Sequence, residues 1–433
     1  MKQSTLRELK PFFILWFTQS LSSLGSAMTS FALVVWSYQQ EGSALTTSML
    51  TICSYAPYVL MSIFAGALSD KWNKKVTMLI SDSFAALCTV WVLVLLKTGN
   101  LQIWHLYLNN ALNGLMNTVQ QPASDVAITL LTPKKFYQKV SGLRSFSNSL
   151  ITILTPAAAS SVLSFWGMDA VIAIDLLTFL IAFLALLFLV PIPHKEQKGD
   201  REALFASAKA GLIFLLENRG ILDLILFLAA INFTASAYNA ALPAMLLSRQ
   251  NGGESVLGLV NTCSGIATLA GSVVVSLLPA PKSRVRVICN TLLFSMSTEN
   301  FMLAFGRTPL VWCTGAVLGW LLIPVMNANM DVIFRNRIPV EMQGRVYAAR
   351  NTLQFFTIPI GYLTGGFLID YILEPFMAVQ PESGLLYAAF GSGKGTGAAF
   401  LYFIIAFIGI MTCLIFRKDK HLWSLERKEQ GSC

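Results

Sequence analysis

The sequence predicts an all-α membrane protein with twelve transmembrane helices, arranged as two pseudo-symmetric halves of six helices. Three observations support this fold class. The 433 residues are 55% hydrophobic and only 12% charged, whereas about a quarter of the residues of a soluble domain are charged. Apolar runs of about 20 residues recur along the chain, and a helix of that length crosses the hydrocarbon core of a bilayer. The third observation is an internal repeat, described below.

The apolar runs give the predicted spans in order. They are 11–36, 48–68, 76–97, 101–122, 140–163, 168–190, 221–247, 255–278, 286–305, 309–332, 346–371 and 397–416. Residues 1–190 are thus expected to form an N-terminal six-helix bundle, and residues 221–433 a C-terminal bundle with a short tail. Residues 191–220 are expected to be a cytoplasmic linker that contains an amphipathic helix.

The distribution of Lys and Arg predicts the orientation of these helices. Of the 31 Lys and Arg residues, only Lys97, Arg249, Arg307 and Lys394 fall in the loops on one side of the membrane. Cytoplasmic loops collect Lys and Arg, so we expect this side to be external and both termini to lie in the cytoplasm, at a plasma membrane. The same bias accounts for the net charge of +9, so no nucleic-acid partner is expected.

The stretch 391–397, GSGKGTG, is similar in composition to a phosphate-binding loop. It does not match the Walker pattern GxxxxGK[ST], because Gly395 follows Lys394. Its predicted position outside the cell also removes it from ATP. We therefore expect no nucleotide partner and interpret the stretch as a flexible external loop before the last helix.

The sequence contains no cluster of residues typical of a catalytic or metal site. The seven cysteines include no CxxC pair, and the three histidines are scattered. We therefore expect no catalytic residue, no metal and no cofactor. A membrane enzyme or a non-transporting sensor remains an alternative from a different functional class, but no soluble output domain or catalytic cluster is predicted.

Two stretches that lie 206 residues apart repeat. The identical positions are Asp125, Val126, Pro133, Val140 and Arg144 in the first stretch and Asp331, Val332, Pro339, Val346 and Arg350 in the second. Two halves related by an axis along the membrane normal are typical of one class of secondary transporter, in which substrate binds near the midplane.

Four charges within this repeat are candidate gate residues. Asp125 and Asp331 end predicted helices at the inner face, and Arg144 and Arg350 begin the next helices. We interpret them as paired gate charges, with Lys74 as another candidate partner of Asp125. The alternative is a set of solvated loop charges.

The stretch 66–75, GALSDKWNKK, resembles the loop 2–3 signature of the major facilitator superfamily, G-x-L-x-D-R-x-G-R-[KR]. The residues that match or conservatively replace the pattern are Gly66, Leu68, Asp70, Lys71, Lys74 and Lys75. Asn73 replaces the second glycine, and we expect it to adopt a left-handed turn, which Asn tolerates. The resemblance implies the major facilitator fold and an inner gate, in which Asp70 contacts basic groups or a helix N-terminus.

Three further stretches resemble bacterial macrolide-efflux (Mef-type) drug exporters. They are residues 170–182, 202–226 and 344–370. This resemblance implies export of a hydrophobic or amphipathic compound by alternating access, driven by inward movement of protons. Proton-coupled exporters of the superfamily usually carry an Arg in helix 4, but residues 101–132 contain no Lys or Arg, so another coupling ion stays open. Export of a specific metabolite, such as a siderophore or a lipid-like molecule, is the alternative within the same class.

Two acids lie well inside predicted spans and are candidates for proton coupling. They are Asp175 in helix 6 and Glu299 in helix 9. A charge inside the membrane is costly, so it marks a functional candidate. The alternatives are a structural hydrogen bond for Asp175 and closeness to the outer surface for Glu299. We interpret Asp82, near the inner end of helix 3, as part of the inner gate.

The resemblance also implies that helices 1, 4, 7 and 10 line a substrate cavity, with contributions from 5, 8 and 11. The candidate cavity residues on these helices are Gln19, Asn113, Met116, Asn117, Asn148, Asn232, Tyr238, Asn239, Asn327, Gln354 and Phe355. A neutral polar cavity with aromatic and Met surface suits a bulky amphipathic ligand. Each amide can instead serve ordinary helix packing. We expect the protein to act as a monomer in the bilayer.

Overall fold

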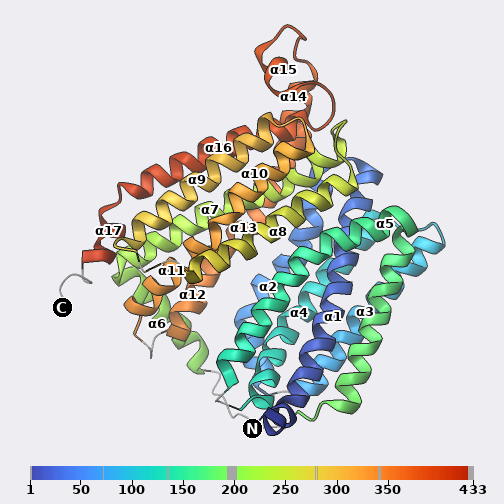
Figure 1. The fold of residues 1–433 in the computed structure, drawn as a ribbon, viewed down its shortest axis with the longest axis vertical. Coiled ribbons are helices and arrows are strands. Elements are labelled where there is room, and N and C mark those ends of the chain that lie inside the picture. Colours follow the sequence, from blue (N-terminus) through green and yellow to red (C-terminus); the bar gives the residue numbers. More distant parts are fainter. Residues whose placement is uncertain are drawn as a thin grey trace. The chain divides into compact units, whose positions relative to one another are not determined.

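The structure is a computed structural model that describes residues 2–71, 73–133, 136–192, 202–277, 279, 281–339 and 343–427. All regular secondary structure among these residues is helical (Figure 1). The chain divides into two compact units. Unit 1 contains Met1–Ser37 and Met49–Arg201, and unit 2 contains Tyr38–Ser48 and Glu202–Cys433.

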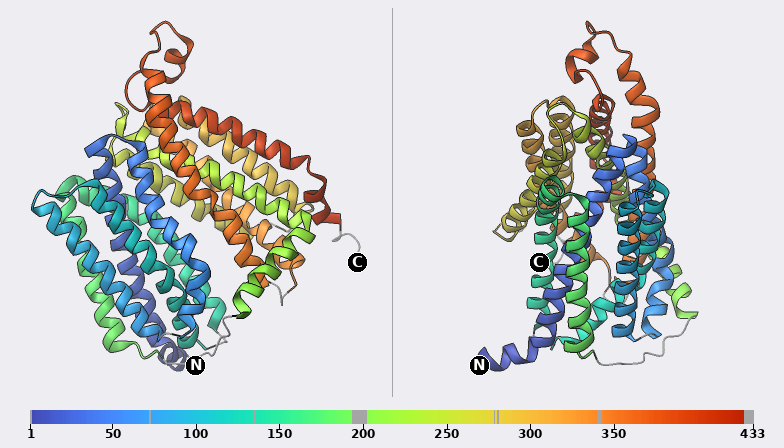
Figure 2. Two further views of the ribbon diagram at one scale, coloured as in Figure 1. Left: turned by 180° about the vertical axis from the view of Figure 1, so that it is seen from behind. Right: turned by 90° about the vertical axis from the view of Figure 1, so that its right-hand side faces the viewer.

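Unit 1 is built from the first five helices of the chain, coloured blue to green in Figure 2. They are α1 (Lys2–Glu41), α2 (Ala44–Lys71), α3 (Lys74–Lys97), α4 (Ile103–Leu131) and α5 (Tyr137–Leu189). Two helices are joined within α5 at Gly167, whose φ of 79° favours glycine. The predicted spans 140–163 and 168–190 lie on either side of this glycine.

Unit 2 contains the remaining helices. They are α6 (Glu202–Glu217), α7 (Arg219–Ser248), α8 (Glu254–Leu277), α9 (Arg284–Phe305), α10 (Pro309–Leu321), α11 (Ile323–Arg337), α12 (Gln343–Phe355), α13 (Thr357–Phe367), the π-helix η3 (Leu368–Leu373), α14 (Glu374–Ala378), α15 (Leu385–Phe390), α16 (Thr396–Arg417) and α17 (Lys420–Arg427). The predicted span 309–332 breaks at Leu322, and 346–371 breaks at Phe356. Pro324 and Pro359 follow these breaks closely, and proline removes a helical hydrogen bond.

Nearly all described residues of the predicted spans are helical apart from these two breaks, although α1 begins nine residues before its predicted span and α4 ends nine residues after its span. In the described part of the chain, seven helical stretches are long and apolar enough to cross a membrane. The structure therefore confirms a polytopic helical membrane protein, while the count of twelve spans stays a prediction.

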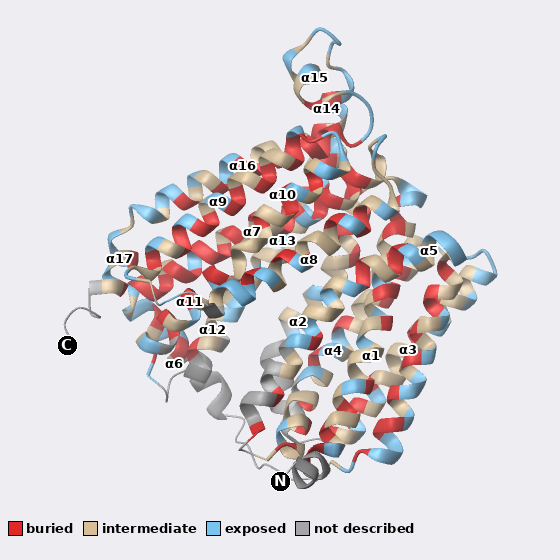
Figure 3. Ribbon diagram, viewed as in Figure 1, coloured by how far each residue is buried: buried red, intermediate tan, exposed pale blue. Residues whose placement is uncertain are grey.

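Individual helices differ in how far they are buried (Figure 3). In α7, 67% of the most apolar 18-residue window is buried, against 17% in α3. α7 is the centre of unit 2, since α13 and α16 pack against it and Phe227 stacks on Phe416 with ring centroids 4.8 Å apart. α3 exposes Ile80, Leu87 and Val94, which are spaced seven residues apart on one face. An exposed apolar stripe of this kind fits contact with lipid.

The segment 38–48, which joins α1 to α2, belongs to unit 2 rather than to the N-terminal bundle. The Tyr38 hydroxyl donates to the carbonyl oxygen of Ala244 at 2.9 Å. The carboxylate of Asp370 accepts from the backbone amides of Ala44 at 2.9 Å and Leu45 at 2.8 Å. These amides begin α2 and have no partner within the helix, so an acid from η3 satisfies and stabilises this helix end.

Two short helices cover the end of unit 2 at which α7 and α9 begin. α6, from the predicted linker 191–220, packs against α12 and α7, while residues 193–201 of that linker lie outside the described residues. α17 buries Leu422 and Leu425 in the same hydrophobic core. The carboxylate of Glu426 accepts from the Ser283 hydroxyl and from the Val285 amide, both at 2.8 Å, and thereby caps α9.

Replacing Glu426 by Ala should lower the thermal stability of the purified full-length protein. The substitution removes the acceptor at the start of α9, and loss of a helix cap costs about 1–2 kcal/mol. Thermal denaturation in detergent should give a lower melting temperature for Glu426→Ala than for Ser424→Ala, which changes an exposed residue of the same helix. Equal melting temperatures would contradict the proposed role of α17.

Candidate functional site

Unit 1 encloses a polar cavity of about 480 Å³. Polar side chains from one face of α1 and one face of α4 line it at spacings of three to four residues, which places them on one side of each helix. They include Gln19, Ser23, Ser26 and Ser30 on α1 and Asn109, Asn113, Asn117 and Gln120 on α4. Of the predicted cavity residues in this unit, Gln19, Asn113, Asn117 and Asn148 line the cavity, and Met116 does not.

Asp175 lies at the edge of this cavity, where α1 and α5 pack closely. Its side chain is 4% exposed, and its Oδ1 accepts from the Ser26 hydroxyl at 2.9 Å. Gly25 allows the close approach, because a Cβ atom there would lie 2.9 Å from the Cα atom of Asp175. Asp175, a predicted candidate for proton coupling, therefore both packs against α1 and lines the cavity.

Asp82 also lines the cavity, and so does the gate candidate Arg144, so a role of Asp82 at the inner gate stays a prediction. Gln19 Nε2 donates to its Oδ2 at 3.0 Å, and Gln120 Nε2 donates to its Oδ1. The three side chains come from α3, α1 and α4. Two neutral amides thus hold this carboxylate within the helices of unit 1.

Unit 2 contains a second, smaller cavity of about 220 Å³. Its walls are largely apolar and include Leu228, Ile231, Leu292, Met296 and Met326. Among the predicted cavity residues, Asn232, Tyr238, Asn327 and Gln354 line it, and Asn239 and Phe355 do not. The cavity combines an apolar surface with a few polar groups, as sites for amphipathic ligands do.

Glu299 is the acidic residue of the unit 2 cavity. It is 5% exposed, and its Oε1 accepts from the Tyr238 hydroxyl at 2.7 Å and from Trp320 Nε1 at 3.1 Å. The Tyr402 hydroxyl donates to the carbonyl oxygen of Tyr238 at 2.9 Å and braces that residue. Among the described residues, no Lys, Arg or His forms an ion pair with Glu299. Neutral donors alone hold the carboxyl group, so it can change its protonation state without breaking an ion pair.

Gly319 provides the space that the Glu299 carboxyl group occupies. A Cβ atom at this position would overlap Oε2 and lie 2.5 Å from Cδ. Gly319 precedes Trp320 on α10, so one helix supplies both the space and a hydrogen-bond donor. The sequence spacing alone could not reveal this pairing, since it depends on how α10 is rotated against α9.

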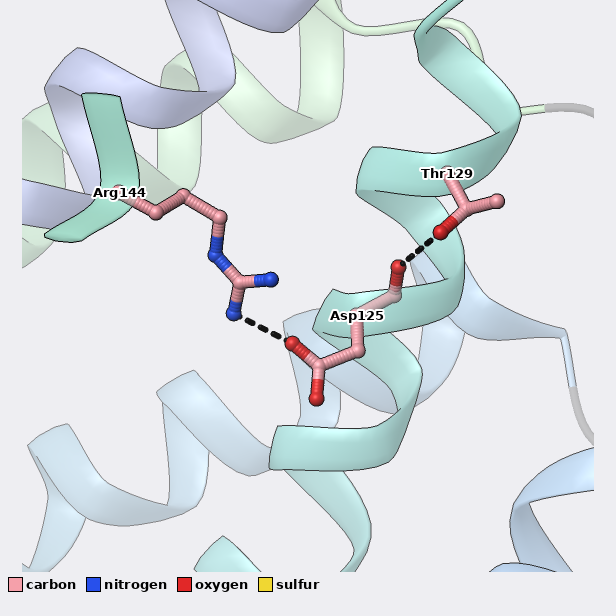
Figure 4. A network of polar contacts seen from close by, with 3 residues as sticks. All are labelled: Asp125, Thr129 and Arg144. Carbon is pink, nitrogen blue, oxygen red and sulfur yellow. Dashed lines mark hydrogen bonds and ion pairs between the residues drawn. The ribbon is translucent and has the colours of Figure 1, made fainter. Parts of the chain in front are cut away.

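The predicted gate charges form an ion pair in unit 1 but not in unit 2. Arg144 Nη2 donates to Asp125 Oδ1, and the Thr129 hydroxyl donates to the carbonyl oxygen of Asp125 at 2.9 Å (Figure 4). Arg350 makes no ion pair with Asp331, and its guanidinium instead lies 4.6 Å from the centre of the Phe334 ring. The repeated sequence positions therefore have different contacts in the two units.

Part of the loop 2–3 signature lies where the structure gives no side chains. Gly66, Leu68, Asp70 and Lys71 have helical backbone in α2, but their side chains lie outside the described residues. Lys75 Nζ donates to the carbonyl oxygens of Leu187 and Val190, both at 3.0 Å. Lys75 belongs to α3, and its ammonium group satisfies carbonyl groups that α5 leaves open at its C-terminal end.

The left-handed turn expected at Asn73 is wrong. Its φ is −64° and its ψ is 115°, which is extended backbone. The Asn73 side chain accepts from the amides of Lys75 at 3.0 Å and Val76 at 3.3 Å, so it caps α3. An N-cap residue has extended backbone, so Asn fits this position because it caps a helix well and not because it tolerates a left-handed turn.

The glycine-rich stretch 391–397 lies at the start of α16. Gly391, Gly393 and Gly395 have φ values of 80°, 87° and 88°, which glycine adopts readily. The Glu374 carboxylate accepts from the amides of Gly395 at 2.9 Å and Ala398 at 3.3 Å. The open amides therefore face a carboxylate of the protein, which would repel a phosphate.

No group of three or more His, Cys, Asp or Glu side chains is arranged to hold a metal ion within the described ranges. Gln120, Gly319, Trp320 and Tyr402 were not singled out from the sequence. Gln120 could have been found, because it follows Asn117 by three residues on the same face of α4. The others contact Glu299 or its partner from different helices, and the sequence carries no signal for that.

Comparisons with known proteins give a consistent result. A sequence profile of the Major Facilitator Superfamily matches residues 15–361. Macrolide efflux protein A of Streptococcus pyogenes is 24% identical over 369 residues, which cover 83% of this chain and 90% of that protein. The multidrug efflux pump Tap of Mycolicibacterium fortuitum is 21% identical over 379 residues, which cover 83% of this chain and 89% of the pump.

The fold is also found among solved structures. A crystal structure of a mutant of the nucleoside transporter NupG superposes with a TM-score of 0.69 and covers 95% of this chain and 99% of that chain. The sequence identity is 14%, so this likeness concerns the fold alone.

Replacing Gly319 by Ala should destabilise the protein by about 1–3 kcal/mol, the usual cost of adding atoms to a packed interior. Because the added methyl group overlaps the Glu299 carboxyl group, Glu299→Ala should remove part of that cost in the double variant, although the Cβ atom that alanine keeps would still lie 2.7 Å from the added methyl group. Thermal denaturation of both single variants and the double variant measures the coupling. Gly315→Ala, one turn earlier on α10, is the matched control and should not couple to Glu299→Ala. Additive effects of Gly319→Ala and Glu299→Ala would contradict the packing described here.

Proposed function

The chain belongs to the major facilitator superfamily, and we propose that it exports hydrophobic or amphipathic compounds in exchange for protons. It is a multi-pass membrane transporter of that superfamily. The observation that carries the proposal is the Glu299 site. A buried carboxyl group with two neutral donors faces a cavity that is otherwise largely apolar.

The apolar cavity supports the proposed substrate class. Met296, Met326 and Trp320 offer polarizable surface to a bulky ligand, while Asn232 and Asn327 offer a few hydrogen bonds. Two of the relatives are named for macrolide efflux and multidrug efflux. Such compounds carry large apolar surfaces, which these walls suit.

Glu299 gives the site a means of exchanging a proton for a substrate. Tyr238 and Trp320 both donate to Oε1, and this arrangement holds whether or not Oε2 carries a proton. Proton binding leaves the cavity uncharged, whereas proton loss creates an unpaired negative charge that is costly inside the membrane. A substrate that supplies positive charge or hydrogen-bond donors offsets this cost, so substrate and proton compete for Glu299.

Asp175 is the second candidate for coupling. Its carboxylate accepts from Ser26, and it lies at a close contact between α1 and α5. The tight packing gives a structural reason for the residue, as the packing of Gly319 does for Glu299. Asp175 faces the polar cavity, whereas Glu299 faces the largely apolar cavity that suits the proposed substrate, so Glu299 is the first residue to test.

The remaining assignments follow from charge. The Lys and Arg bias supports a location in the plasma membrane with both termini in the cytoplasm. Asp125, Arg144 and the lysines of the loop 2–3 signature act as the inner gate, and Asp331 and Arg350 occupy the equivalent positions of the second half. The transporter acts as a monomer and alternates access by rocking of its halves, as transporters with parallel repeats do.

Cells that lack their own efflux pumps and express this protein should accumulate less of some amphipathic antibiotics and dyes than cells without it. A protonophore should abolish the difference, because the proposed driving force is the proton gradient. Glu299→Gln, at equal membrane levels, should return accumulation to that of cells without the protein, since its side chain keeps both acceptor contacts but cannot bind or release the proton.

Asp175→Asn is the matched control for this measurement. Its amide oxygen can still accept from Ser26, so we expect protonophore-sensitive export to persist. Wild-type export by the Glu299→Gln variant would contradict the role of Glu299. Unchanged accumulation of every compound tested, in cells that contain the wild-type protein, would contradict export of amphipathic compounds.

Reversal of a single gate charge should impair export, and exchange of both charges should restore part of it. Asp125→Arg and Arg144→Asp each place two like charges together, although this partly exposed pair contributes no more than about 1 kcal/mol to stability. The same accumulation assay should show the double variant above both single variants. A double variant no better than either single variant would indicate that the pair has no role in gating.

A further inference from the structure

We propose that Asp82, Gln19 and Gln120 form a binding site in unit 1 for one alkali-metal cation of the size of sodium. The three side chains come from α3, α1 and α4 and converge on the polar cavity. Each carboxylate oxygen of Asp82 contacts one of the two amide groups, with Gln19 at 3.0 Å. This site is separate from Glu299, which lies in unit 2.

The first argument is charge. Within the described ranges, Asp82 forms no ion pair with Lys, Arg or His. Arg144 lines the same cavity, but its guanidinium pairs with Asp125. The cavity therefore contains two carboxylates, Asp82 and Asp175, without a basic partner of their own, and a bound cation would compensate one of them.

The second argument is the chemistry of the ligands. A glutamine amide presents an NH₂ group on one side and a carbonyl oxygen on the other, in nearly the same shape. Rotation of the Gln19 and Gln120 amides by half a turn would replace both donors with acceptor oxygens. A cation bound there would then be surrounded by the Asp82 carboxylate and two amide carbonyl oxygens, which are the ligands that hard cations prefer.

More oxygen ligands lie within one helical turn. Ser23 follows Gln19 by four residues, Asn117 precedes Gln120 by three, and Ser124 follows Gln120 by four. All three line the cavity, and residues at this spacing share a helix face. Together with water, they can complete the coordination of a cation that Asp82 neutralises.

The third argument is an unsatisfied acceptor in the same cavity. Asn109 is 7% exposed, and its Oδ1 has no hydrogen-bond partner in the described part of the chain. A buried oxygen without a donor is unusual, and a cation or its bound water would satisfy it. The residue lies about three helical turns from Gln120 on the Asn face of α4, so the cavity offers a further acceptor oxygen outside the site itself.

The single negative charge selects the class of cation. One carboxylate balances one monovalent ion, whereas a divalent ion would leave a positive charge uncompensated inside the membrane. The absence of a described cluster of His, Cys, Asp and Glu argues against transition metals. Sodium accepts mixed carboxylate, amide, hydroxyl and water oxygens, so the site fits it.

The test is binding of radiolabelled sodium to the purified full-length protein in detergent, at constant ionic strength with choline as the replacement cation. Wild-type protein should bind sodium saturably, and lithium should compete better than choline. Asp82→Asn should abolish the binding, while Asp169→Asn, which changes a partly exposed acid of the same unit outside the cavity, should retain it. Gln120→Leu should weaken binding by at least the roughly 10–100-fold that loss of a supporting partner costs at metal sites.

Gln19→Leu and Gln120→Leu keep the charge of Asp82, so they test the site even if Asp82→Asn does not give monodisperse protein. No saturable sodium binding to the wild type would overturn the proposal, as would equal affinity in all of these variants. The experiment uses neither a substrate nor a proton gradient. Its outcome is therefore independent of whether the protein exports amphipathic compounds.

Discussion

The structure depends on how membrane-spanning helices provide hydrogen bonds to a carboxyl group buried between them. Lipid offers no hydrogen-bond donor, so a carboxyl group between such helices needs hydrogen bonds from neighbouring helices. Glu299 obtains them from Tyr238 and Trp320, and Gly319 supplies the room that its carboxyl group occupies. Neutral donors stabilise the group without fixing its charge. The same property that makes the acid tolerable in the membrane also makes it available for proton exchange.

The two units apply this constraint in different ways. Unit 1 surrounds Asp82 with amides in a polar cavity, whereas unit 2 places Glu299 against apolar walls. Their contacts also diverge where their sequences repeat, since Arg144 pairs with Asp125 while Arg350 lies over Phe334. The repeated positions thus have different contacts, and the polar cavity of unit 1 and the largely apolar cavity of unit 2 fit the proposed ion site and the proposed amphipathic ligand respectively.

The sequence predicted the helices well because length and hydropathy decide what can cross a membrane. It also identified Glu299 and Asp175, since an acid within an apolar run is conspicuous. It could not place Asp82, because a residue near a helix end can face either a loop or a cavity. The hydrogen bonds from Gln19 and Gln120 show that Asp82 faces the cavity. Asn73 shows the same limit at a turn, where an expected left-handed backbone proved to be an extended helix cap. Rotation of one helix against another is the information that hydropathy lacks.

The most direct test of the central claim is proton release when a ligand binds. Purified protein in weakly buffered detergent solution, with a pH-indicating dye, would be titrated with a macrolide or another amphipathic compound that it binds. Competition at Glu299 predicts that each bound molecule releases about one proton near the pH at which the site is protonated. Glu299→Gln should bind the compound without releasing a proton. Ligand binding to the wild type with no proton release at any pH, or equal release by the variant, would contradict the account.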